Sequence, residues 1–126
     1  MNEIEHHEEL IRGISKQMKP ILESSEQAIY IYLDDVHKVC NKKFASLLGY
    51  GSPDEWARVE EPMLEVSVDK RSQETLVETY NRAMEKMTGS TIPVTWKKKS
   101  GGTVDTTVML VPIAYDGTLF ALHFVS

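Results

Sequence analysis

His123 is the residue of this sequence whose side-chain chemistry contrasts most with that of its neighbours. It lies in the segment TLFALHFVS, where a strand would place its imidazole on the same face as Leu119, Ala121 and Val125. An unperturbed histidine has a pKa near neutrality, so an imidazole at this position could bind a ligand or report pH. The commoner role of a histidine within an apolar strand is that of a core residue hydrogen-bonded to a neighbour.

The other histidines and the single cysteine carry weaker signals. Glu3 and His7 are spaced to chelate a metal weakly from one helix, although a solvated charged face is the commoner outcome. His37 is expected beside a hairpin turn, facing water. Cys40 is expected to be a buried, inert thiol, and one cysteine excludes both an internal disulfide and a Cys-rich zinc site. The sequence therefore predicts no metal site.

The sequence offers no set of residues typical of an active site. We find no nucleophile with a base, no paired carboxylates in an apolar setting and no metal-ligand spacing, so no catalytic residue is predicted. The nearest enzymatic alternative is a ketosteroid-isomerase-like fold, in which an aspartate is the general base of an apolar pocket. That fold would need long helices before most of the sheet, whereas a strand-rich run precedes the short helices here. Asp105, the one strand acid, should point away from the inner face.

Composition favours a single domain without affinity for nucleic acids. The 126 residues are 41% hydrophobic and 26% charged, which suits one domain with its own core. The formal net charge of −5 argues against nucleic-acid binding. No apolar run approaches the ~20 residues that span a bilayer, and the acidic start lacks a signal peptide's apolar region. We therefore expect a soluble, cytoplasmic protein with no membrane contact.

The first segment has the pattern of an amphipathic helix. Its apolar stripe consists of Ile4, His7, Ile11, Ile14, Met18 and Ile21. We expect the helix to end near Lys19, before Pro20, and we treat residues 1–21 as a dimerisation or capping helix and residues 22–126 as the main domain. Because the stripe is too short for a coiled coil, the helix must dock on the sheet or on a second subunit.

The rest of the chain alternates between short strands and helices. Two β-rich runs flank the turn-prone pair Asp34-Asp35, which predicts a hairpin. Asn41 and Ser52 are good N-caps for two short helices. Asp69 begins a longer helix that Gly89 is expected to end. The last third is β-rich, with glycine-containing turns between three predicted strands.

Four stretches in this order resemble the PAS family of sensory domains, over about Leu22 to Val125. NKKFASLLGY is similar to the family's helix that ends in Leu-Gly-Tyr, and VDKRS to the start of its long helix. WKKKSGG and VPIAYDGTLFALHFV are similar to its hairpin and closing strands. The resemblance implies an α+β fold, a five-stranded antiparallel sheet with short helices on one face. PAS domains generally sense a small molecule, redox state or light, or dimerise, and pass the change to an effector.

The resemblance also implies a cavity on the inner face of the sheet. The residues that match ligand-facing PAS positions are Phe44, Tyr80, Met84, Val94, Trp96, Thr106, Val108, Leu110, Ala121 and His123. Such a cavity would be mainly apolar, with Thr106, Tyr80 and His123 as polar anchors, unless these side chains simply fill the core. Flavin and haem fit poorly, because the flavin-binding cysteine motif is missing, Trp96 would occupy the cofactor's volume, and the long helix carries no histidine.

Both faces of the last strand are apolar, so both need a cover. The short helices can cover one face, and the N-terminal helix is the candidate for the other, within one chain or across a homodimer. We therefore predict a non-catalytic sensory domain that binds a small molecule in an apolar pocket. It would relay the change through the sheet and the N-terminal helix, possible partners being a second copy and a separate effector protein. The alternative is a ligand-free module for protein interaction and dimerisation.

Overall fold

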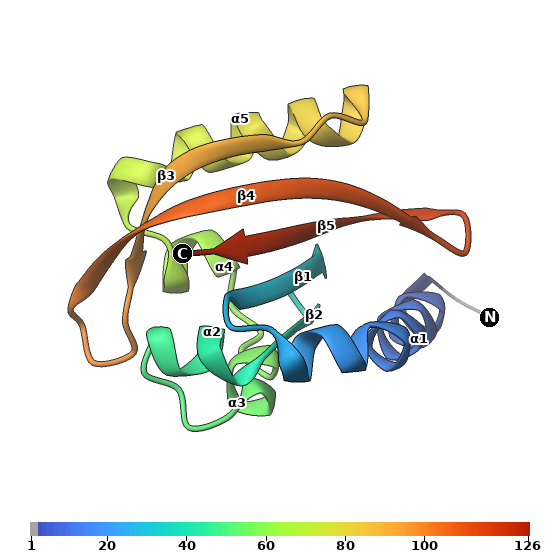
Figure 1. The fold of residues 1–126 in the computed structure, drawn as a ribbon, viewed down its shortest axis with the longest axis horizontal. Helices are drawn as coiled ribbons and strands as arrows, with labels where there is room; N and C mark the ends of the chain where they lie inside the picture. Colours follow the sequence, from blue (N-terminus) through green and yellow to red (C-terminus); the bar gives the residue numbers. More distant parts are fainter. Residues whose placement is uncertain (1–2) are drawn as a thin grey trace.

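Five strands form one antiparallel sheet in the order β2-β1-β5-β4-β3 (Figure 1). The computed structural model describes residues 3–126. The strands are β1 (Ala28–Asp34), β2 (His37–Cys40), β3 (Ser90–Lys97), β4 (Thr103–Tyr115) and β5 (Thr118–Val125). The first two pair across the predicted turn, and β5 pairs with both β4 and β1. The predicted α+β fold is confirmed, and the strand that closes the chain lies at the centre of the sheet.

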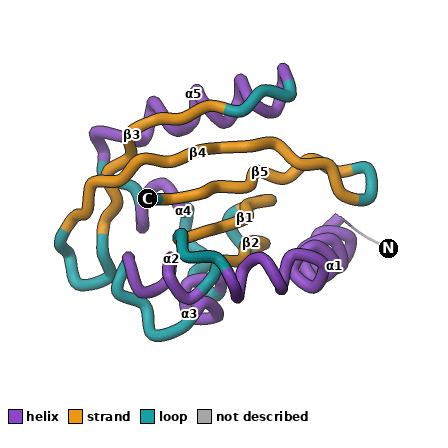
Figure 2. The backbone as a smooth tube through the Cα atoms, in the orientation of Figure 1, coloured by secondary structure: helices purple, strands orange, loops and turns teal. Residues whose placement is uncertain are grey.

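Helices cover both faces of this sheet (Figure 2). They are α1 (Glu3–Ser24), α2 (Lys42–Leu47), α3 (Pro53–Ala57), α4 (Met63–Ser67) and α5 (Lys70–Lys86). Residues of α2 to α5 pack on the inner face, and residues of α1 pack on the outer face. None of the helices within residues 3–126 combines the length and the apolar character needed to cross a bilayer.

The predicted helix caps are confirmed at three positions. Asn41 Oδ1 accepts from the backbone N–H of Phe44 in the first turn of α2, and also from that of Ile29 in β1. Ser52 and Asp69 likewise accept backbone N–H groups at the starts of α3 and α5. Because Asn41 bonds to two elements, it fixes α2 against the central strands as well as capping it.

The predicted ends of the two longer helices are wrong. α1 continues past Lys19 to Ser24, with Pro20 inside it, because Leu22 is buried against the outer face and draws the last turn onto the sheet. α5 ends at Lys86 rather than near Gly89, because Met87 takes the left-handed conformation (φ 53°) that usually falls to glycine.

α1 of the same chain covers the outer face where β1 and β5 lie. We call the residues that form this contact the outer cluster: Leu10, Ile14, Leu22, Ile29, Ile31, Phe120 and Leu122. The predicted stripe is correct at Ile14, which is 2% exposed, and wrong at Ile21, which is 47% exposed. The side chain of Ile4 lies outside the part that the structure describes. A cover supplied by a second subunit is therefore not needed for the outer cluster, although Met109 of β4 on the same face stays exposed at 44%.

The inner face packs a separate group of residues, in which aromatic rings predominate. Its centre is Tyr30, which contacts the rings of Phe44, Trp56, Trp96 and His123. The last three belong to α3, β3 and β5, so one tyrosine joins elements from across the chain. The candidate site is built around this residue.

Candidate functional site

Tyr30 and His123 are cross-strand partners at the middle of the sheet. They face each other in the β1–β5 pair, and their rings stack with centroids 3.8 Å apart and planes inclined by 8°. Tyr30 is 0% exposed and His123 is 2% exposed. Edge-to-face contacts with Trp56 and Trp96 hold the tyrosine ring from two other sides. The pair is thus rigidly placed, and its polar atoms have fixed directions.

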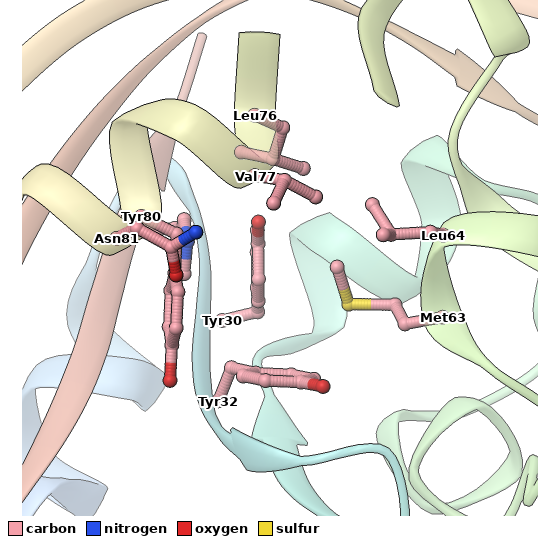
Figure 3. A pocket seen from close by; sticks show the side chains of 9 residues that line it. Tyr30, Tyr32, Met63, Leu64, Leu76, Val77, Tyr80 and Asn81 are labelled. Atoms are coloured by element: carbon pink, nitrogen blue, oxygen red, sulfur yellow. The ribbon is translucent and has the colours of Figure 1, made fainter. Parts of the chain in front are cut away.

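A cavity of about 240 Å³ lies beside this pair, between the sheet and helices α4 and α5 (Figure 3). It is lined by Tyr30, Tyr32, Met63, Leu64, Leu76, Val77, Tyr80, Asn81 and His123. Figure 3 shows the Tyr30 hydroxyl pointing toward Leu76 and Val77 of α5, while Met63 and Leu64 close the side formed by α4. The wall is therefore mainly apolar, with a few polar groups at defined places, which is typical of small-molecule sites.

Two side chains that line the cavity each carry a buried polar atom without a partner. Neither the Tyr30 hydroxyl nor His123 Nδ1 has a hydrogen-bond partner among the described residues. A buried polar atom in this condition costs about 1–3 kcal/mol of stability. Because nearly all buried polar groups in folded proteins are satisfied, an ordered water or a bound molecule with matching groups would be expected to meet them.

Burial keeps both of these side chains neutral. It raises the pKa of Tyr30 well above its usual value. It lowers the pKa of His123 to about 3, although the carbonyls of Tyr30 and Ala121 lie close enough to oppose part of that shift. Burial also raises the pKa of Tyr32 and of Tyr80. The charge of Asp35 adds to the rise at Tyr32, and so does the hydrogen bond that the Tyr32 hydroxyl donates to Asp35 Oδ1, 3.0 Å away. The cavity is thus lined by neutral side chains, which favours a neutral occupant.

Only two of the ten ligand-facing residues suggested by the resemblance, Tyr80 and His123, line this cavity. Six others are packed in the core with 1% exposure or less: Phe44, Val94, Trp96, Val108, Leu110 and Ala121. Thr106 accepts from Trp96 Nε1 at 2.8 Å and donates to the Val94 carbonyl, so its hydroxyl is already used. Met84 is half-buried against the same core. The space expected around Trp96 is filled by side chains.

Seven lining residues were missed, and Tyr30 is the most consequential of them. The run AIYIYL places Tyr30 and Tyr32 two residues apart, hence on one face of a strand, and that spacing could have pointed to both. The lining residues of α4 and α5 had a weaker signal. Val77 and Asn81 are partly or largely exposed, so they belong to the mouth of the cavity and not to a buried stripe.

Other predicted residues lie away from the cavity. Asp105 is exposed and accepts the Thr95 hydroxyl at 2.7 Å, which confirms that it points away from the inner face. Cys40 is buried as predicted, and burial raises the pKa of its thiol to about 12. The prediction that His37 faces water is wrong. It is 7% exposed, because α1 brings His7 against the β1–β2 turn and covers it.

Similarity to known proteins is found at the level of structure. No protein-family model matches the sequence, and no curated protein matches it. A PAS domain from Colwellia psychrerythraea shares 21% identity with a TM-score of 0.69, over 90% of this chain and 95% of that one. A PAS domain from a two-component sensor histidine kinase shares 13% identity with a TM-score of 0.67, over 91% and 96% of the two chains.

A third solved structure gives the same result. The PAS domain of nitrogen regulation protein NR(II) from Vibrio parahaemolyticus shares 19% identity with a TM-score of 0.64, over 85% of this chain and 94% of that one. The shared feature is the whole arrangement of sheet and helices, since the aligned regions span nearly all of each chain. The chain has the PAS fold, as the order of its sequence motifs predicts.

Proposed function

Given its PAS fold, we propose that this chain is a non-catalytic sensory domain that binds a small neutral molecule in the cavity under α5. The observation that carries the proposal is the pair of unpartnered polar atoms, Tyr30 Oη and His123 Nδ1, on two side chains that line one cavity. The hydroxyl can donate to an acceptor of the ligand, and the neutral imidazole can donate or accept according to its tautomer. A ligand that satisfies both would recover the cost of burying them.

The cavity also limits the size and charge of the ligand. Its volume of about 240 Å³ lies below the ~300–1,000 Å³ of sites for drug-sized molecules, so the ligand is a small metabolite. None of the nine lining residues carries a carboxylate, an ammonium or a guanidinium group. The ring of Tyr80 and the edges of Leu76 and Val77 suit a flat, largely apolar compound with one or two hydroxyl, carbonyl or amide groups.

The strand order supports a route for the signal. Tyr30 lies between Ile29 and Ile31, which point to the other face and belong to the outer cluster. Its partner His123 likewise follows Leu122, another member of that cluster. A ligand that displaces Tyr30 or His123 therefore moves side chains that contact α1, and α1 is the element that would pass the change to an effector protein.

The first experiment compares native and denaturing mass spectra of the purified protein. We expect an added native mass that disappears on denaturation. If the purified protein carries no ligand, we expect at least one compound from a set of neutral single-ring molecules to bind, as monitored by backbone amide NMR. Signals of Tyr30 and His123 should be among the most shifted. A bare native mass together with no shifted signal across the set would contradict the proposal.

A pair of tryptophan variants places the ligand. Val77→Trp should fill the cavity from α5 and abolish the added mass or the NMR shifts, because Val77 lines the cavity. Glu78→Trp is the matched control, since Glu78 is the next residue on α5 and is exposed. Equal binding by both variants would place the ligand elsewhere. The NMR signals of the Ile29 and Ile31 methyl groups in the wild type test the proposed transmission from the cavity to α1. If these signals do not shift when a ligand binds, that route is ruled out.

The second candidate is a ligand-free interaction module that forms a homodimer. It is supported by exposed apolar side chains on α1 and on the sheet, Ile21 at 47% and Met109 at 44%. Because α1 already covers the outer cluster, a second copy would use the exposed side of α1. Sedimentation analysis of the wild type and of Ile21→Asp distinguishes the two candidates. A dimer that Ile21→Asp dissociates, together with an empty cavity, would favour the module.

A further inference from the structure

Three side chains that commonly bind metals meet at the β1–β2 turn, on the side of the sheet away from the cavity. His7 comes from α1, Asp34 ends β1 and His37 begins β2. One nitrogen or oxygen atom of each lies within 4.8 Å of the others. The two histidine rings are 5.6 Å apart and nearly perpendicular. Residues 30 positions apart in the chain thus converge on one carboxylate.

Both histidines lie within hydrogen-bond distance of that carboxylate through Nδ1. His7 Nδ1 lies 2.8 Å from Asp34 Oδ2, and His37 Nδ1 lies 2.8 Å and 3.0 Å from the two oxygens. Tetrahedral bonds of about 2.0–2.1 Å would separate neighbouring ligand atoms by about 3.3 Å. To take up an ion, each nitrogen–oxygen separation would widen by about half an ångström, and the ligand nitrogens of the two histidines, which lie within 4.8 Å of each other, would approach to the same spacing. The partly exposed His7 side chain, at 25% exposure, has room for such a movement.

The surroundings hold the carboxylate in place. Asp34 Oδ1 accepts the backbone N–H groups of Val36 at 3.0 Å and of His37 at 2.8 Å, so the turn itself orients the acid. Such outer hydrogen bonds are what position the ligands of established metal sites. Although partial burial alone would raise the pKa of Asp34, hydrogen bonds with His7 and His37 hold it below its usual value.

We propose that His7, Asp34 and His37 form a binding site for a divalent transition-metal ion, Zn²⁺ being the best match, that fastens α1 to the β1–β2 turn. Two imidazoles and one carboxylate suit zinc better than calcium or magnesium, which prefer sets of oxygen ligands. Three protein ligands leave a fourth position for water, as in exchangeable sites and unlike closed structural ones. The site is independent of the small-molecule cavity, and the ion would control how firmly α1 is held on the outer face.

The sequence predicts no metal site, because its local spacing pairs His7 with Glu3 on one helix and the turn position of His37 predicts a side chain in water. The side chain of Glu3 lies outside the described residues. The pairing that matters joins α1 to a turn 27 residues further along the chain, and no local spacing contains it. Only the docking of α1 on the sheet brings the three groups together.

The test is a zinc titration of untagged, chelator-stripped protein, followed by calorimetry and by thermal unfolding. We expect one Zn²⁺ per chain and a higher Tm in zinc, reversed by excess chelator. His7→Ala should weaken zinc binding at least about tenfold and remove the rise in Tm. His6→Ala is the matched control, because His6 is the preceding residue and is exposed, and it should bind like the wild type.

Two further measurements keep the outcome decisive. Co²⁺ in place of Zn²⁺ should give visible absorption bands of a four-coordinate site in the wild type and in His6→Ala, and lose them in His7→Ala and His37→Ala. Far-ultraviolet circular dichroism of each variant confirms that the fold is kept, and His7→Ala is read alone if His37→Ala unfolds. A wild type that binds no zinc, or zinc affinity that is unchanged in His7→Ala, would overturn the proposal. The three side chains would then serve only to hold α1 on the turn through hydrogen bonds.

Discussion

The two faces of the sheet are sealed by different kinds of side chain, although they share the same strands. On the outer face, Ile29 and Ile31 pack with Ile14 of α1 into a cluster that is mostly aliphatic. On the inner face, Tyr30 sits among aromatic rings and leaves a cavity with two unpartnered polar atoms. Residues that are neighbours in the sequence therefore have opposite tasks. The outer cluster attaches α1 to the sheet, whereas the inner face combines a closely packed aromatic core with a cavity beside it.

Loss of the Trp96 ring should have the largest effect on stability. Trp96 is 0% exposed, packs edge-on against Tyr30 and Phe44, and donates to Thr106. We expect Trp96→Ala to lower the free energy of unfolding by about 3–5 kcal/mol, measured by urea denaturation. A loss well below this range would show that the inner face is loosely packed throughout. The two faces would then differ in how tightly their side chains pack, and not only in the presence of a cavity.

The seal of the outer face is tested from α1. Ile14→Ala should lower the free energy of unfolding by about 2–4 kcal/mol, because Ile14 is 2% exposed in the outer cluster. Ile21→Ala is the matched control in the same helix, and at 47% exposure it should change stability by less than about 0.5 kcal/mol. Equal effects of the two variants would show that α1 does not dock in solution as it does here.

The same two faces show what the sequence can and cannot predict. Alternation in TLFALHFVS correctly assigns Ala121 to the inner core and Phe120 to the outer cluster, because a strand has a strict period of two. The position of the cavity could not be predicted in this way. It depends on how far rings from distant elements reach, and Trp96 and Phe44 fill the region where a ligand was expected. The prediction that His37 faces water is wrong for the same reason, because its burial depends on a residue from a distant element, His7 of α1.

Acid should destabilise the protein through the inner face. The pKa of His123 is about 3 in the folded chain and near its ordinary value of 6.5 in the unfolded chain. Between these values only the unfolded chain binds the proton, so stability is full above pH 6.5 and falls as the pH decreases. We expect a loss of about 1.4 kcal/mol per pH unit between pH 6 and pH 4, measured as the free energy of unfolding in urea.

Two variants separate this contribution from other acid effects. His123→Phe should flatten the slope by roughly the amount given above, because the ring no longer titrates. His6→Ala should leave the slope unchanged, since its imidazole is exposed on α1 and lies outside the aromatic core. A slope that is the same in His123→Phe as in the wild type would mean that His123 is not held neutral by burial.

The smallest effect, and the one of opposite sign, should come from the hydroxyl of Tyr30. Tyr30→Phe removes a buried group without a partner, so the free energy of unfolding of the ligand-free protein should rise by about 1 kcal/mol. Thr106→Val is the matched control on the same face, because it removes a hydroxyl that bonds to both Trp96 and Val94 and should cost about 1 kcal/mol. If Tyr30→Phe is as destabilising as Thr106→Val, the hydroxyl is satisfied in the ligand-free protein, and the cavity loses the feature that marks it as a binding site.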